Sequence, residues 1–158
     1  MNETSKSQST EFIRTTSENS DFRNLITALD EDLYRRNGEA QLQYRQYNQV
    51  DLINHVVVVY LEGKPVGCGC YKRFEDETVE MKRMFVLPEM RGKQLAAQML
   101  QELEKWAVEE GNTAAVLETG RRQVEAIRLY TVAGYLPTEN YGQYVGMEES
   151  ICYRKELK

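Results

Sequence analysis

The residues most able to do chemistry lie in one stretch, MKRMFVLPEMRGKQLAAQML, at positions 81–100. Its pattern predicts a strand that ends near Pro88, a tight turn that contains Gly92, and an amphipathic helix. The first turn of a helix carries backbone N–H groups without partners and a partial positive charge, so it stabilises anions such as phosphates. Arg91 and Lys93 would add positive charge, and Gly92 would let a ligand approach the backbone. An ordinary turn with solvated basic residues fits this stretch equally well.

Two motifs in this order resemble those of the GCN5-related N-acetyltransferase (GNAT) family, in its small single-domain bacterial type. The segment RGKQLA is similar to the family's acetyl-coenzyme A motif, which runs Gln or Arg, two residues, Gly, one residue, then Gly or Ala. Arg91 and Ala96 match this motif, whereas Gln94 stands where glycine is usual. LYTVAGY at 129–135 is similar to a second signature of the family, Leu-Tyr, three residues, Gly, then Phe or Tyr. The resemblance covers the chain from about residue 55 to its end.

The resemblance implies that acetyl-coenzyme A (acetyl-CoA) binds as co-substrate, without a metal. Backbone groups of Met84, Phe85 and Val86 would hold the pantetheine arm and orient the thioester carbonyl. Gln123 stands where many members of the family have an asparagine that contacts the cofactor. The pyrophosphate would be held by the amides of one continuous segment, formed by Arg91, Gly92, Lys93, Gln94, Leu95, Ala96 and Ala97.

Acetyl transfer to an amine needs a base, because only a neutral amine attacks a thioester, and a proton donor for the departing thiolate. Glu80 matches the position of the family's glutamate base. With a strand period of two, we expect its side chain on the same face as that of Val86. A structural ion pair with Lys82 or Arg83 is the competing interpretation of Glu80. Tyr130 matches the family's tyrosine near the cofactor sulfur and would be the acid, although a tyrosine packed in the core is the alternative.

A Tyr- and Gly-rich segment, YGQYVG at 141–146, precedes the last predicted strand and resembles a Tyr-Gly-x-Tyr segment of small bacterial GNAT proteins. Tyr141 or Tyr144 would stack on an acceptor or favour its ammonium group. A surface turn whose tyrosines pack on neighbouring strands is equally consistent with this segment. A second polar and aromatic cluster fits either an acceptor site or a solvated helix face, and it consists of Tyr34, Arg35, Arg36, Tyr44 and Arg45.

The elements that position these residues follow from the spacing of apolar side chains. Helices are expected from Asp21 to about Gly38, over 39–48, from Leu95 to about Ala107, and over 123–133. Strands are expected over 12–16, 55–61, 65–74, 79–86, 114–117 and 147–157, with a further short strand after Tyr135. This order predicts an α/β (α+β) fold with a mixed, mostly antiparallel sheet and helices on both faces. It agrees with the GNAT-like acyl-CoA N-acyltransferase fold that the resemblance implies.

The composition of the chain limits the classes of function. The chain has 158 residues, a formal net charge of -5 and 41% apolar residues, which fits a polar tail at 1–10 and one domain at 11–158. An acidic chain is a poor nucleic-acid binder. The N-terminal residues contain no apolar run, which indicates neither a signal peptide nor a membrane anchor, so we expect a cytoplasmic protein. Three cysteines and one histidine are too few for a zinc site and fit buried, reduced thiols.

These observations favour an acetyl-CoA-dependent N-acetyltransferase, active as a monomer or homodimer. It would move an acetyl group to a primary amine of a small molecule or peptide, by direct attack in a ternary complex. A non-catalytic acyl-CoA-binding sensor or interaction module would keep the turn at 91–97 but have no use for Glu80 or Tyr130. A generic nucleotide-binding domain is remote, because the sequence has neither a P-loop nor a GxGxxG motif.

Overall fold

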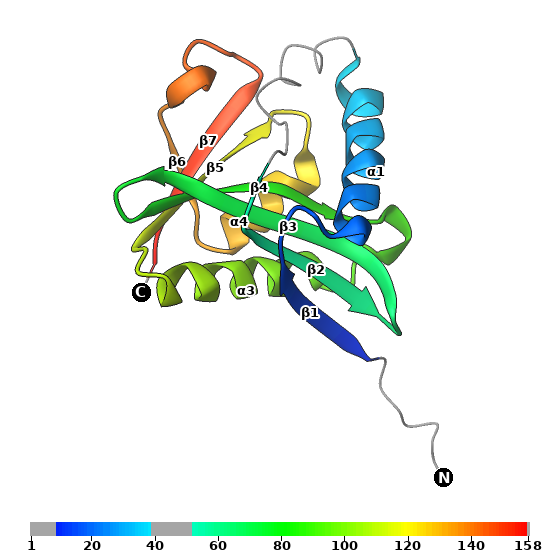
Figure 1. The fold of residues 1–158 in the computed structure, drawn as a ribbon. Helices are drawn as coiled ribbons and strands as arrows, with labels where there is room; N and C mark the ends of the chain where they lie inside the picture. The colour runs from blue at the N-terminus through cyan, green and yellow to red at the C-terminus, as the bar shows by residue number, and fades with distance from the viewer. Residues whose placement is uncertain (1–8, 39–51, 158) are drawn as a thin grey trace.

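The computed structural model describes residues 9–38 and 52–157 (Figure 1). In these ranges seven strands form one sheet, in the order β1-β2-β3-β4-β5-β7-β6. The pair β4 and β5 is parallel and the other neighbouring pairs are antiparallel. The predicted mixed, mostly antiparallel sheet is therefore confirmed. The helix predicted over 39–48 lies outside the described residues.

The bounds of the elements agree with the predicted ones to within three residues. β5 continues to Gly120, three residues beyond its predicted end, and β1 begins at Thr10, inside the predicted polar tail. The strands are β1 (Thr10–Thr15), β2 (His55–Leu61), β3 (Lys64–Glu75), β4 (Thr78–Val86), β5 (Ala114–Gly120), β6 (Leu136–Thr138) and β7 (Ser150–Glu156). The helices are α1 (Ser20–Asn37), α3 (Leu95–Glu109) and α4 (Val124–Val132), with short 3-10 turns η4 (Pro88–Met90) and η5 (Gly142–Tyr144).

Helices cover both faces of the sheet, as predicted, and Figure 1 shows α1 and α3 on opposite sides of it. On one face, Phe22 and Leu25 of α1 join a buried cluster with Cys68 and Cys70 of β3. Burial raises the pKa of the Cys70 thiol to about 12, so this thiol is unreactive at neutral pH. On the other face, α3 and α4 pack on the sheet through Met99, Leu100, Leu103, Ala107 and Tyr130.

A bulge interrupts the regular alternation of β4. Cys68 of β3 lies opposite Phe85, whereas Cys70 lies opposite Lys82. Between these two pairs, β3 has one residue and β4 has two. An extra residue on one strand of a pair is a β-bulge. Within it, Arg83 adopts a left-handed conformation with φ of 58°. Such a conformation is unfavourable for a residue with a Cβ atom, so the packing around β4 has to hold it in place.

The bulge decides which face each side chain of β4 occupies. Val79 and Met81 belong to the buried cluster under α3, so Glu80 between them points to the opposite face. Val86 belongs to the cluster under α3 as well. Glu80 and Val86 therefore lie on opposite faces, and the prediction that their side chains share a face was wrong. The reason is the extra residue of the bulge, which shifts the alternation between the two positions.

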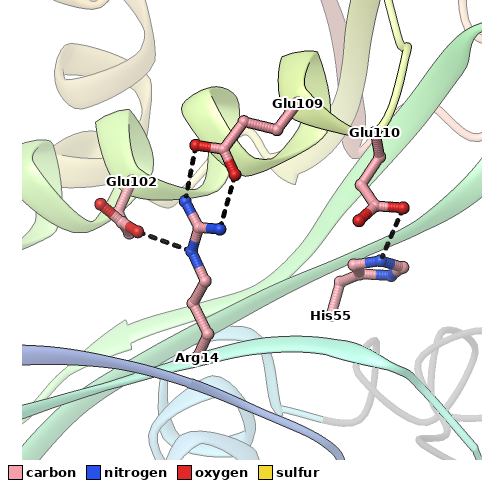
Figure 2. A network of polar contacts seen from close by, with 5 residues as sticks. All are labelled: Arg14, His55, Glu102, Glu109 and Glu110. Carbon is pink, nitrogen blue, oxygen red and sulfur yellow. Dashed lines mark hydrogen bonds and ion pairs between the residues drawn. The ribbon is translucent and has the colours of Figure 1, made fainter.

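Ion pairs tie the edge strand β1 to α3, as Figure 2 shows. Arg14 of β1 lies 2.7 Å from a carboxylate oxygen of Glu109 and 2.8 Å from one of Glu102. On the neighbouring strand β2, Nε2 of His55 lies 3.9 Å from Glu110. Arg14 therefore bridges two carboxylates that lie about two turns apart on the same face of α3, and it links β1 to this helix. Exposed pairs of this kind contribute little to stability.

Candidate active site

β4 and β5 pair over only part of their length. The pairing joins Thr78–Met81 to Ala114–Leu117, while β4 continues to Val86 and β5 to Gly120. Among the described residues, positions 82–86 and 118–120 are thus the ends of the two strands that do not pair with each other, here called the unpaired ends. Backbone amides at such ends suit an extended ligand that itself carries amide groups.

The turn between β4 and α3 presents backbone N–H groups, as the sequence predicts. Gly92 has φ of 87° and Gln94 has φ of 63°, and α3 begins at Leu95 without a side-chain cap. The first N–H groups of α3 therefore lack an intrahelical partner and point away from the helix. Gln94, which departs from the family motif, occupies a left-handed position that favours glycine. Its backbone nevertheless forms the turn.

Arg91 does not direct its charge toward this turn. Its Nε donates a 2.9 Å hydrogen bond to the carbonyl oxygen of Val86, and Nη2 lies 3.7 Å from Asp32 of α1. The guanidinium also lies over the ring of Phe85, 5.7 Å from its centroid. We expected Arg91 and Lys93 to add positive charge at the turn. For Arg91 this expectation is corrected, because its guanidinium contacts Val86, Asp32 and Phe85 instead. The side chain of Lys93 is exposed at the turn.

Beside the unpaired ends, on the face that carries α1, lies a buried polar cluster. Glu80 is 4% exposed, and its Oε2 accepts a 2.8 Å hydrogen bond from the hydroxyl of Tyr141. Nζ of Lys82 lies 3.9 Å from the same oxygen and donates a 3.3 Å hydrogen bond to the hydroxyl of Tyr144. The two tyrosines of the YGQYVG segment thus contact the predicted base and its neighbour. Tyr144 is fully buried and packs on Cys152 of β7, as in the alternative in which the tyrosines pack on neighbouring strands.

Glu118 adds a second carboxylate to this cluster. It is the first residue of β5 after the last parallel pair with β4, and its Oε2 accepts a 2.7 Å hydrogen bond from Ser150. Burial raises the pKa of Glu118, while the Ser150 bond and the charge of Lys82 oppose the rise. We call Glu80, Lys82, Glu118, Tyr141, Tyr144 and Ser150 the buried polar cluster.

Sequence reasoning considered Lys82 only as an ion-pair partner of Glu80 and missed two other members of the buried polar cluster, Glu118 and Ser150. Lys82 and Glu118 are charged residues within buried strands, and this was the available signal. Ser150 carries no signal in the sequence, because its role depends on the register of β7 against β5. Of the second predicted cluster, Tyr34 and Arg35 are exposed on α1. The side chain of Arg36, together with Tyr44 and Arg45, lies outside the described residues.

Comparison with known proteins identifies the family. The family model described as the Acetyltransferase (GNAT) family matches residues 21–135. This chain belongs to the GNAT family. Its relative in Azospirillum brasilense, an IAA acetyltransferase, is 34% identical over 137 residues, which are 84% of this chain and 88% of the relative.

Solved structures share the fold of this GNAT protein. A Klebsiella pneumoniae subsp. pneumoniae protein assigned as an acyl-CoA N-acyltransferase is 29% identical, with a TM-score of 0.76 over 94% of this chain and 98% of its own. The PaiA N-acetyltransferase from Thermoplasma acidophilum, solved in complex with coenzyme A, has a TM-score of 0.71 at 17% identity, over 94% of this chain and 99% of its own. The protein is an acetyl-CoA-dependent acetyltransferase, as the sequence motifs indicate.

The residues of this GNAT enzyme fit acetyl-CoA. Nε2 of Gln123 is buried without a hydrogen-bond partner, and a buried amide donor without an acceptor is unfavourable. Gln123 immediately precedes α4, at the position that the family resemblance assigns to the cofactor. The uncapped N-terminus of α3 offers further donors, which suit the pyrophosphate. The unpaired end of β4 offers the backbone groups that suit the pantetheine arm.

Tyr130 lies in the core of the acetyltransferase, on the face of α3. It is 6% exposed and packs against the rings of Tyr135 and Tyr153, with centroids 5.9 Å and 6.4 Å away. Burial raises the pKa of Tyr130, and the charge of Glu118 raises it further. The phenol therefore stays protonated at neutral pH, as a proton donor must.

Two further features concern ligands and membranes. Over 9–38 and 52–157, the side chains of His, Cys, Asp and Glu form no group of three or more that could hold a metal ion. None of the helices in the described ranges is long and apolar enough to cross a membrane.

Proposed function

We propose that this enzyme transfers the acetyl group of acetyl-CoA to a primary amine of a small molecule or peptide, by direct attack in a ternary complex. The observation that carries this proposal is the burial of Glu80 and Glu118 beside the unpaired ends of β4 and β5. Together with Lys82, the cluster holds two carboxyl groups and one amine. Such a site favours a cationic acceptor.

Glu80 would act as the base. Both of its contacts, with Tyr141 and with Lys82, involve Oε2, so Oε1 is the oxygen that would accept the proton of the acceptor ammonium. Tyr141 would hold the carboxylate in one orientation while the proton moves. The 3.9 Å contact with Lys82 also fits a purely structural ion pair, which is the observation that favours the alternative of a non-catalytic acyl-CoA sensor.

The remaining residues would position the co-substrate. Backbone groups of Met84, Phe85 and Val86 would align the thioester carbonyl, and the amides of 91–97 would hold the pyrophosphate. Gln123 would donate its unpartnered Nε2–H to an acceptor of the cofactor. Tyr130 would give its proton to the sulfur of the departing thiolate, since its phenol is protonated at neutral pH.

The test measures release of free thiol from acetyl-CoA across a panel of small amines and peptides with free amino termini. We expect turnover with at least one cationic amine, and a loss of turnover in Glu80→Gln and in Tyr130→Phe. Acetyl-CoA binding that persists while no amine in a broad panel is acetylated would favour the sensor. Wild-type rates in both variants would overturn the assignment of the two residues.

A further inference from the structure

Lys82 places an amine of the protein itself inside the buried polar cluster. It is the first residue of β4 beyond the last parallel pair with β5, and its side chain is 6% exposed. Its Nζ lies 3.3 Å from the Tyr144 hydroxyl, 5.9 Å from the centroid of that ring, and 3.9 Å from Oε2 of Glu80. The carboxylate of Glu80 is also the group that would bind an acceptor ammonium in the proposed reaction, through its other oxygen.

The surroundings of Lys82 favour its neutral form more than water does. Burial lowers the pKa of Lys82, and the positive charge of Lys72 lowers it further, while Glu80, Glu118 and Cys70 act in the opposite direction. A lysine with a lowered pKa has a larger fraction of neutral, nucleophilic amine at physiological pH.

The thioester would come within reach of this amine. Lys82 is two residues from Met84, whose backbone would align the thioester carbonyl in the proposed function. Two residues of a regular strand span about 7 Å, which is an upper limit here because the bulge at Arg83 lies between them, and the four-carbon stem of lysine is flexible and of comparable length. Among the described elements, β5 does not pair with β4 beyond Met81. On the side of β4 that faces β5, no strand backbone in the described ranges therefore separates the Lys82 amine from the thioester.

We propose that Lys82 is an internal acetyl acceptor, which the enzyme acetylates from its own bound acetyl-CoA when no other amine occupies the site. In the step, Nζ of Lys82 forms a bond to the acetyl carbon, and the bond from that carbon to sulfur breaks. The amine gives up a proton to Glu80, and the departing thiolate takes a proton and leaves as free coenzyme A. The product is a neutral amide on Lys82. The proposal rests on the proposed function, since it uses the same cofactor position and the same base.

Acetylation would switch the site off. The amide has no positive charge, so it cannot hold the carboxylate of Glu80 as the ammonium does, 3.9 Å from Oε2. The added acetyl group also occupies the space next to Tyr144, where an acceptor amine would bind. The enzyme would thus become less active when acetyl-CoA is abundant and its acceptor is scarce.

The experiment incubates the native full-length enzyme with acetyl-CoA in the absence of an amine, and maps acetylated lysines by peptide mass spectrometry. We expect one acetyl group on Lys82, formed faster than in heat-denatured protein and at least tenfold more slowly in Glu80→Gln. Transferase activity measured afterwards should fall in proportion to the acetylated fraction. Lys82→Arg should lose no activity during the incubation. Lys72→Arg, an exposed position in register with Glu80, should behave as wild type.

The outcomes separate this inference from the proposed function. An enzyme that acetylates an external amine while Lys82 stays unmodified overturns the inference and leaves the proposed function intact. Acetylation of Lys82 without turnover of any amine supports the inference and contradicts the proposed acceptor. Equal rates of Lys82 acetylation in native and denatured protein also overturn the inference, because they indicate ordinary chemical acetylation.

Discussion

The hydroxyl of Tyr141 donates a 2.8 Å hydrogen bond to Oε2 of Glu80, although 61 positions separate the two residues in the chain. This bond joins the loop before β7 to β4, on the face of the sheet that carries α1. Burial raises the pKa of Tyr141, and the charge of Glu80 and the hydrogen bond to it raise it further. The phenol therefore remains a donor, and it fixes the orientation of the carboxylate that is the proposed base.

Tyr141→Phe tests this positioning. The ring would keep its edge-to-face contact with Phe74, at 4.7 Å between centroids, while the hydrogen bond to Glu80 is lost. We expect kcat to fall about tenfold, with the KM for acetyl-CoA unchanged, because one hydrogen bond to a charged group is worth about 1.5–3 kcal/mol at most. Steady-state kinetics with one saturating amine gives both parameters. An unchanged kcat in a folded Tyr141→Phe protein would contradict the positioning role.

Gln123→Ala tests the fit of the cofactor. In the free protein Nε2 of Gln123 has no partner, so its removal should leave the unfolding free energy unchanged or slightly higher. With acetyl-CoA bound, the same change removes a hydrogen bond, and we expect the Kd to rise about tenfold, which is about 1.4 kcal/mol. Isothermal titration calorimetry and thermal unfolding measure the two effects. Arg122→Ala, at the exposed neighbouring position, is the control, and an equal change in both variants would exclude a specific contact.

Gln94→Gly tests the departure from the family motif. Gln94 has φ of 63°, which costs a residue with a Cβ atom roughly 1 kcal/mol relative to glycine. We expect Gln94→Gly to raise the unfolding free energy by up to about 1 kcal/mol and to bind acetyl-CoA at least as tightly. Gln94→Ala keeps the Cβ atom and should show no such gain. Urea unfolding curves of the wild type, Gln94→Gly and Gln94→Ala measure these differences. A gain in Gln94→Gly alone indicates backbone strain, whereas a loss in both variants indicates a role of the glutamine side chain.

Ser150→Ala tests the environment of Glu118. Burial raises the pKa of Glu118 above the value of 4.5 that it has when unfolded, and the Ser150 bond limits that rise. A raised carboxyl pKa means that stability decreases as pH increases from about 4.5 to the folded pKa. Without the Ser150 bond the pKa of folded Glu118 is higher, so the pH range over which stability decreases extends to higher pH. The loss of unfolding free energy should therefore be larger at about pH 7 than at about pH 4, and an equal loss at both values would contradict this account.

His55 gives a pH dependence of stability on the face of the sheet that carries α3, opposite the buried polar cluster. Burial lowers its pKa below 6.5, and the charge of Glu110 partly opposes this shift. The contribution of neutral His55 is therefore complete above about pH 6.5 and is lost as pH falls through the folded pKa. Its ring stacks on Tyr71 at 4.6 Å. His55→Phe should keep that stacking and remove this part of the pH dependence.

Glu110→Gln provides the second arm of this test, because it removes the charge that Figure 2 shows next to His55. The pKa of His55 should fall further, so protonation at low pH becomes more costly. We expect a larger loss of stability between about pH 8 and about pH 5 than in the wild type, measured by urea unfolding. A steeper pH dependence in His55→Phe than in wild type would contradict the role of this imidazole.

Local patterns in the sequence were sufficient for much of the fold. The run HVVVVYL predicted β2 with its observed bounds, and the apolar spacing after Gly92 predicted α3. Both depend on interactions between residues close together in the chain. The turn at 91–97 was predicted for the same reason, because the strand, the turn and the helix N-terminus follow one another in the chain. The family motifs are likewise short stretches of contiguous residues.

The sequence by itself determined the family and the order of the elements of this acetyltransferase, and it predicts the cofactor segment at 91–97. Tertiary structure alone decided where the polar groups meet. The bulge at Arg83 arises from pairing with β3 and moves Val86 to the face opposite Glu80. Likewise, Glu118 meets Ser150 only because β5 and β7 pair in a given register. Such contacts depend on the packing of distant segments, and no local pattern of residue types encodes them.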